Sequence, residues 1–137
     1  MYYIFCVDER GGRMFMKRRQ SQDRALRERV LALAAGHTLW MSNYSARQFT
    51  EGGGFTVDDN YTEKAGAGDY CFVEDKEFDL SNCEGIILYN WNRHYPSDVK
   101  WTVDLEAEGF VQTAQTEFVG HSHEKITETI YQKEVVR

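Results

Sequence analysis

Hydrophobic positions along the chain form short, continuous apolar runs, separated by polar segments and glycines. Runs of this kind at residues 3–7, 38–41, 70–74 and 85–91 predict four buried strands. Continuous apolar runs, without alternation of polar and apolar positions, are typical of strands that are covered on both faces of a parallel sheet.

Between the first two strands the pattern changes to helical spacing. Leu26 and Val30 are four residues apart and begin an apolar stripe on one face of a helix. Ser21 or Asp23 can cap the start of this helix, and Gly36 can end it. Two shorter helices are predicted at residues 44–49 and 58–64.

The C-terminal part of the chain predicts strands without helices between them. Residues 110–118 and 126–136 predict two long strands, and residues 100–105 predict an edge strand after the turn at Pro96. The late strands therefore favour antiparallel pairing, whereas the early strands alternate with helices. The fold class that follows is α/β, with a mixed, mainly parallel central sheet, flanking helices and a C-terminal antiparallel β-hairpin.

Chain length and composition place the sequence among globular proteins. It has 137 residues and is 42% hydrophobic, so we expect residues 1–137 to form a single domain. No segment approaches the ~20 apolar residues of a membrane span, and the N-terminal apolar run is too short for a signal peptide. Cys6, Cys71 and Cys83 are odd in number and widely spaced, which favours reduced thiols. We expect a cytoplasmic protein that contacts no membrane, and the sequence gives no indication of its oligomeric state.

The net charge of −6 is unevenly distributed. Residues 1–29 carry eight of the 16 Lys and Arg against four acidic residues, which leaves a strongly acidic remainder. Because the rest of the chain is so acidic, a general nucleic-acid-binding function is disfavoured. A local site for a small anion, such as a phosphate or carboxylate, fits better, and a solvated basic helix face is the alternative.

The order of these elements resembles that of the dihydrofolate reductase family. Residues 7–12 are similar to that family's first strand and its glycine-containing loop, and residues 38–41 to its second strand. Residues 42–45 stand where the family has its cofactor-phosphate turn, and the tail from Phe110 is similar to its closing hairpin. The resemblance covers nearly the whole chain, by pattern more than by identity.

The resemblance also implies candidate site residues. Asp23, at the opening of the first predicted helix, stands where the family has its pterin-binding acid and becomes the candidate catalytic residue. A carboxylate there could bind the edge of an amidine-like ring through paired hydrogen bonds. Its alternative role is structural, as an acidic residue favoured by the helix dipole.

Departures from the family concern the cofactor. Glu74 and Asp75 replace a glycine pair, and their carboxylates would repel the phosphates of a dinucleotide. Asn43 replaces the basic residue of the cofactor turn, although Ser45 keeps a hydroxyl there, and the chain is shorter through residues 50–68. We therefore expect no cofactor, with NADP binding doubtful, and a retained fold whose reductase activity is lost.

Polar and aromatic residues after the fourth strand complete the predicted ligand site. Trp91 could stack on a base or ring and Arg93 could bind a phosphate or carboxylate, although aromatic packing under a loop is the alternative. The candidate ligand-binding residues are Arg18, Arg19, Ser45, Arg47, Asn90, Trp91 and Arg93.

His121 and His123 form an H-x-H pair that, in a strand, would place both imidazoles on one face and within reach of one metal. The pair resembles part of the ribonuclease Z motif. That motif continues with further ligands, where this chain has Glu124 and Lys125. A polar hairpin turn is the alternative, and it is the one we favour.

Four functions are consistent with the sequence. The first is a diverged dihydrofolate reductase-like protein that binds a small nucleotide-like or heteroaromatic anion without reductase activity. The alternatives are an NADPH-type oxidoreductase with an altered cofactor site, a small ribonuclease Z-like or RNA-binding protein, and a protein–protein module. Whether the chain is an enzyme stays open, and an oxidoreductase fits better than a metal-dependent nuclease.

Overall fold

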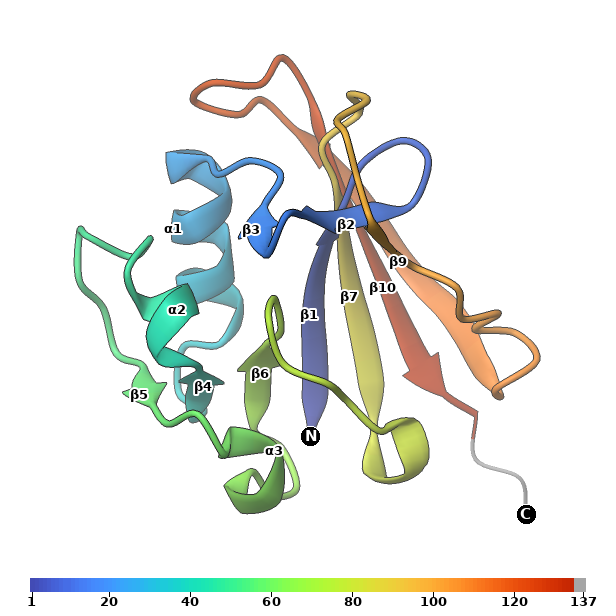
Figure 1. The fold of residues 1–137 in the computed structure, drawn as a ribbon. Helices are drawn as coiled ribbons and strands as arrows, with labels where there is room; N and C mark the ends of the chain where they lie inside the picture. Colours follow the sequence, from blue (N-terminus) through green and yellow to red (C-terminus); the bar gives the residue numbers. More distant parts are fainter. Residues whose placement is uncertain (135–137) are drawn as a thin grey trace.

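The computed structural model describes residues 1–134, whose strands form two sheets (Figure 1). In spatial order, the larger sheet contains β5 (Thr56–Val57), β4 (Leu39–Met41), β6 (Tyr70–Phe72), β1 (Tyr2–Val7), β7 (Gly85–Asn90), β10 (Ile126–Lys133) and β9 (Phe110–Phe118). The smaller sheet contains β3 (Arg18–Arg19), β2 (Gly12–Phe15) and β8 (Val99–Lys100). The helices are α1 (Arg24–Leu33), α2 (Asn43–Ala46), α3 (Tyr61–Lys64) and the short 3-10 helix η1 (Leu80–Asn82).

The larger sheet is mainly parallel. β1 pairs in parallel with β6 and β7, and β4 pairs in parallel with β5 and β6. β10 runs antiparallel to both β7 and β9. This arrangement confirms the predicted mixed sheet with a C-terminal antiparallel hairpin.

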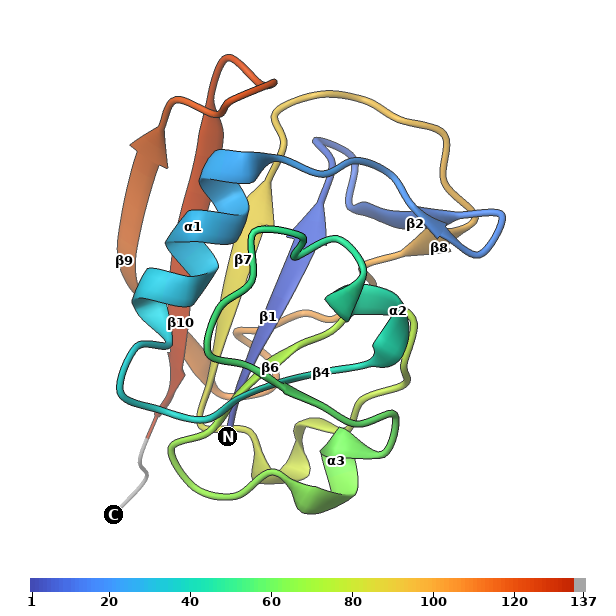
Figure 2. The same ribbon diagram turned by 90° about the vertical axis from the view of Figure 1, so that its left-hand side faces the viewer.

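Helix α1 covers one face of this sheet (Figure 2). Asp23 caps it, because its carboxylate accepts hydrogen bonds from the backbone N–H groups of Ala25 and Leu26. Leu26 and Val30 are fully buried against the sheet, as their spacing predicts. Sequence periodicity and the capping residue therefore fix both the start and the buried side of α1.

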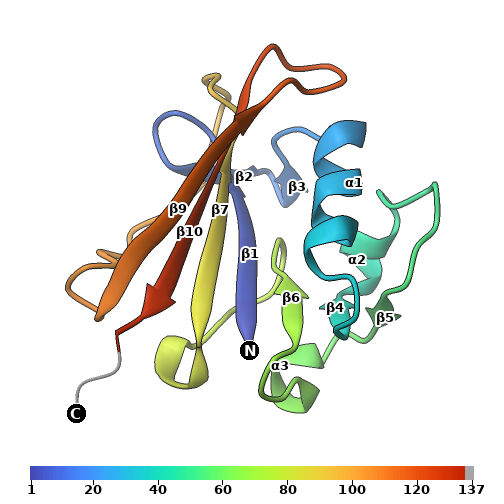
Figure 3. The ribbon, with the colours of Figure 1, turned by 180° about the vertical axis from the view of Figure 1, so that it is seen from behind.

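The opposite face of the sheet is covered by α3 and by loop segments around residues 78–80 and 101–105. Tyr3 and Phe5 of β1 pack there with Tyr61 of α3 and with Leu105. Figure 3 shows β9 and β10 at the edge of the sheet remote from α2 and β5. The predicted flanking helices are thus found on both faces, but a long helix, α1, covers only one of them.

Two strand predictions need correction. The strand expected at residues 100–105 is wrong: β8 is only Val99–Lys100 and pairs with β2 in the smaller sheet. Trp101 and Val103 instead pack into the core from a loop. The last strand ends at Lys133, and the predicted residues 135 and 136 lie outside the described chain.

Cys6, Cys71 and Cys83 are free thiols, as predicted. Burial raises the pKa of Cys71 to about 12 and also raises that of Cys6 and Cys83, so all three resist forming a thiolate. Through residue 134 we find no helix with the length and apolar character needed to cross a membrane.

Gly85 opens β7 at a point where two other strands lie very close. A Cβ there would lie 2.8 Å from the carbonyl oxygen of Tyr131 and 2.7 Å from Cδ1 of Tyr2. The backbone oxygen cannot retreat without disturbing the β7–β10 ladder, so we expect Gly85→Ala to lower the free energy of unfolding by about 1–3 kcal/mol. Urea denaturation measures this loss. Gly66→Ala is the control, since its Cβ meets no atom within 4 Å, and an equal loss in both variants would contradict the explanation.

Candidate functional site

The carboxyl ends of β1, β4, β6 and β7 meet at one edge of the larger sheet. In open α/β sheets, ligands bind in the crevice outside this edge. Asp8 follows β1, Ser42 follows β4 and Trp91 follows β7, while Glu74 comes two residues after β6. These residues, and the side chains that pack over the ends of the strands, therefore determine the chemistry of any site in this crevice.

Arg19 of β3 lies in this crevice and binds Glu74. Its Nε and Nη2 atoms lie 3.0 and 3.1 Å from the two carboxylate oxygens of Glu74. The same guanidinium lies 4.4 Å from the centre of the Tyr44 ring, and its Nη2 donates to the Tyr44 carbonyl oxygen at 3.1 Å. Gln48 adds a second donor to Glu74 at 2.9 Å. The protein's own side chains thus satisfy the Glu74 carboxylate.

A cavity of about 10 Å³ remains beside this ion pair. It is just large enough for one water molecule. Ser21 and Trp91 lie on its wall together with Arg13 and Arg19. This cavity therefore has room for a single small group.

A larger, open hollow of about 500 Å³ lies next to the crevice, between the β2–β3 hairpin and the chain after β7. Phe15 and Met16 are exposed on one side of it, and Tyr95 lies on the other. Arg18, Arg19, Gln20 and Pro96 complete its lining. The hollow combines apolar and aromatic surface with Arg18, which is exposed, and with Arg19, whose guanidinium is paired with Glu74.

Gln20 lies between the two spaces and carries an unpaired acceptor. Its Nε2 atom donates to Asp8 at 3.0 Å and to the Pro96 carbonyl oxygen at 3.3 Å. Its Oε1 atom is buried and has no hydrogen-bond partner among the described residues. An unsatisfied buried acceptor is costly, so a donor group arriving at this point would be stabilised.

Asp23, the predicted catalytic residue, is 2% exposed and accepts six hydrogen bonds from the protein. Besides the two α1 amides, the donors are the backbone N–H groups of His121 and Ser122, the Ser122 hydroxyl and His123 Nδ1. Burial opposes ionisation, but these hydrogen bonds outweigh it and hold the pKa of Asp23 well below its usual range. The carboxylate joins the start of α1 to the loop between β9 and β10.

His123 continues this network toward two hydroxyl groups. Its Nδ1 lies 2.9 Å from Asp23 Oδ2, and its Nε2 lies 2.9 Å from Ser21 Oγ and 3.0 Å from the Tyr95 hydroxyl. The imidazole is 4% exposed and stacks on Trp91 with ring centres 4.5 Å apart. The arrangement links a buried carboxylate, an imidazole and a serine in one line.

Some of the predicted ligand-binding residues come together in the structure. Arg18 and Arg19 both line the open hollow, and Arg19 and Trp91 both line the small cavity. Asn90, at the end of β7, lines neither space, and its side chain accepts a hydrogen bond from the backbone N–H of Asn92 at 2.8 Å.

Other predicted residues lie apart from these two spaces. Ser45 is buried inside α2, where its backbone N–H donates to Ser42 Oγ at 3.1 Å. Arg47, at the end of α2, and Arg93, in the loop after β7, are exposed and line neither space. Spacing along the chain grouped these residues, but their elements point them in different directions.

The two histidines of the H-x-H pair lie in the loop between β9 and β10 rather than in a strand. His121 is exposed, whereas His123 is buried with both ring nitrogens hydrogen-bonded. From Met1 to Glu134 no group of three or more His, Cys, Asp or Glu side chains could hold a metal ion.

Sequence reasoning missed the partnership of Ser21, Tyr95 and His123. Ser21 has the same local pattern as an ordinary helix-capping serine, and Tyr95 that of an aromatic loop residue. The contact from Ser21 to His123 spans 102 positions in the sequence. No short motif marks such a contact, because it is created by the packing of the β9–β10 loop on the start of α1.

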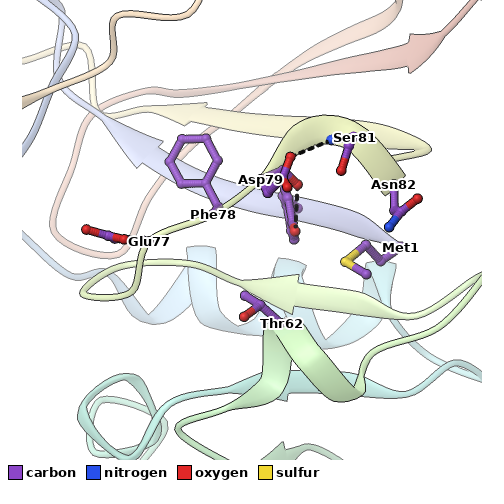
Figure 4. Close-up of a pocket in the computed structure, with 8 residues that line it drawn as sticks. Met1, Thr62, Glu77, Phe78, Asp79, Ser81 and Asn82 are labelled. Carbon is purple, nitrogen blue, oxygen red and sulfur yellow. Dashed lines mark hydrogen bonds between the residues drawn. The ribbon is translucent and has the colours of Figure 1, made fainter.

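A separate hollow of about 280 Å³ lies at the opposite edge of the sheet, beside the N-terminus (Figure 4). Its polar groups largely bond to one another: the Asp79 side chain accepts from the Ser81 N–H at 2.9 Å, and the Tyr3 hydroxyl donates to the Asp79 carbonyl at 3.0 Å. Glu77 and Asp79 give this hollow an acidic rim with no cation-binding geometry.

The fold is similar to that of proteins with solved structures, whereas the sequence has no match. No protein-family model matches the chain, and no curated protein matches it in sequence. Among solved structures, the chain is similar to dihydrofolate reductase from Enterococcus faecalis complexed with NADP(H) and RAB-propyl, with a TM-score of 0.62 at 9% identity. The match covers 98% of this chain and 96% of the reductase. The chain therefore has a dihydrofolate reductase-like fold.

Proposed function

We propose that this protein binds a small, planar, nucleotide-like or heteroaromatic anion in the open hollow beside Arg18 and Arg19, without reductase activity. The observation that carries the proposal is the Arg19–Glu74 ion pair, which fills the crevice at the strand ends. Because that crevice is closed, the space available to a ligand is the hollow next to it.

The loss of reductase activity follows from the chemistry of the filled crevice. The structural neighbour was solved with NADP(H), whose phosphates need donors and positive charge. In this chain the Glu74 carboxylate stands at the strand end, and Arg19, the nearby cation, is already paired with it. A dinucleotide would have to break this pair, of which Glu74 is 7% exposed, and leave a carboxylate unpaired beside its own phosphates.

The chemistry of the hollow supports a planar anionic ligand. A volume of about 500 Å³ is within the usual range for small-molecule sites. Tyr95 and Phe15 offer aromatic surface for stacking, and the exposed guanidinium of Arg18 offers a charged donor.

A binding experiment tests this proposal. We expect AMP or folate to raise the melting temperature, and Arg18→Glu to weaken binding at least tenfold in calorimetric titration, since about 1.4 kcal/mol of charge-assisted contact is lost. Lys17→Glu is the matched control: it makes the same charge change one residue away, on an exposed side chain outside the hollow. Equal weakening in both variants would indicate unspecific charge attraction and contradict the site.

A second experiment on the purified wild-type protein tests the proposed absence of reductase activity. We expect no oxidation of NADPH in the presence of dihydrofolate, followed by absorbance, and no shift in melting temperature with NADPH at millimolar concentration. Turnover of NADPH would instead support the oxidoreductase alternative.

A further inference from the structure

We propose that Ser21, His123 and Asp23 form a hydrolytic triad in which Ser21 is the nucleophile for acyl transfer from a carboxylic ester to water. This activity goes beyond the ligand binding proposed above and does not depend on it. It uses the small cavity beside Ser21 rather than the open hollow beside Arg18.

The distances match the requirements of nucleophilic catalysis by serine. The orienting carboxylate, Asp23, is 2.9 Å from Nδ1 of His123, and the opposite ring nitrogen, Nε2, is 2.9 Å from the Oγ of Ser21. An ionised carboxylate at Nδ1 places the ring proton there, so Nε2 is free to accept the serine proton. Nucleophile, base and orienting group are thus in the required order.

The surroundings hold this geometry rigidly. Asp23 is fixed by backbone N–H groups from both the start of α1 and the β9–β10 loop. The imidazole of His123 stacks on the buried Trp91 ring at an interplanar angle of 26°. Hydrogen bonds keep the pKa of Asp23 far below neutral pH, so the carboxylate is charged when an imidazolium must be stabilised.

Ser21 is the member of the triad that a substrate can reach. His123 and Asp23 are buried, whereas Ser21 is partly exposed. Its cavity of about 10 Å³ accepts a single oxygen-sized group, and Arg13 and Arg19 are among its lining residues. Arg19 is paired with Glu74, whereas the Arg13 guanidinium donates to the Glu74 carbonyl oxygen at 3.4 Å. The positive charge of Arg13 near this cavity would stabilise the oxyanion that forms when a carbonyl carbon is attacked.

The reaction steps balance with water as the only co-reactant. Ser21 Oγ attacks the ester carbonyl carbon while its proton moves to His123 Nε2, and the alcohol leaves with that proton. Water then attacks the acyl carbon and gives a proton to Nε2, and the bond to Ser21 Oγ breaks as the serine regains this proton. The products are a carboxylic acid and an alcohol.

Tyr95 supplies a discriminating feature, because its hydroxyl lies 3.0 Å from the same Nε2. A neutral imidazole offers one lone pair there, so the two hydroxyls compete for it. If Ser21 is the nucleophile, Tyr95→Phe leaves the base to Ser21 alone and keeps or increases reactivity. If the cluster only ties the β9–β10 loop to α1, neither hydroxyl reacts.

Covalent labelling tests the proposal on the whole protein. We expect a fluorophosphonate probe to modify Ser21, located by peptide mass spectrometry, and 4-nitrophenyl acetate to be hydrolysed. Ser21→Ala should abolish both reactions and His123→Gln should slow them at least tenfold, whereas the remote control Ser81→Ala should leave them unchanged. Melting temperatures establish that each variant is folded.

A second variant keeps the test decisive if His123→Gln does not fold. Ser21→Cys retains a nucleophile at the same place and should react with iodoacetamide faster than Cys6, Cys71 and Cys83, whose thiols are held protonated by burial. Absence of labelling in the wild-type protein, labelling of Tyr95 instead, or unchanged labelling in folded Ser21→Ala would each overturn the triad. None of these readouts depends on Arg18, so a failed ligand site and a failed triad are distinguishable.

Discussion

Replacing Asp23 by alanine is expected to lower the free energy of unfolding by about 3–5 kcal/mol, the range for breaking a buried charged network. The variant removes the α1 cap and leaves the His121 and Ser122 amides without the acceptor they share. Urea denaturation followed by circular dichroism measures the loss. Asp79→Ala is the control, because Asp79 is an exposed cap of η1 and should cost about 1 kcal/mol.

The lowered pKa of Asp23 makes the free energy of unfolding depend on pH. Its folded-state pKa lies below the unfolded value of about 3.9, so its contribution is complete above that value and is lost as pH falls toward the folded-state pKa. In Asp23→Asn, which cannot ionise, we expect a shallower loss of stability below about pH 4 than in the wild-type protein. Parallel curves for the two proteins would show that Asp23 is not the controlling group.

Breaking the Arg19–Glu74 pair is the second large effect that we expect. Glu74→Ala leaves the Arg19 guanidinium, whose side chain is 19% exposed, without its carboxylate, and we expect a loss of about 3 kcal/mol. The double variant Arg19→Met/Glu74→Leu removes both charges and should recover most of this loss, because the cost comes from the unpaired charge. Urea denaturation of the single and double variants completes the cycle.

A surface pair provides the control for this cycle. Arg24 and Glu28 form an i,i+4 pair whose side chains are both more than half exposed, so Glu28→Gln should cost less than about 0.5 kcal/mol. A loss from Glu74→Ala no larger than this would mean that the pair contributes little to closing the crevice.

Local sequence patterns were sufficient for the elements of the larger sheet that bury apolar runs. Tyr3–Val7, Gly85–Asn90 and the Asp23-capped helix are where hydrophobicity and capping chemistry place them. These signals act within one element, so they can be read from neighbouring residues. The smaller sheet was missed because β2 and β3 are short, with no apolar run, and their third strand, β8, pairs with β2 from more than 80 positions away.

For the candidate site, too, some features could be predicted from the sequence and others only from the structure. The sequence by itself determined that Asp23 opens a helix and that the charge near α1 is basic. Only the tertiary structure decided that Arg19 fills the crevice and that His123 reaches Ser21 across 102 positions. The reason is physical: capping and burial depend on local geometry, whereas the partners of a buried charge depend on which loops the fold brings together.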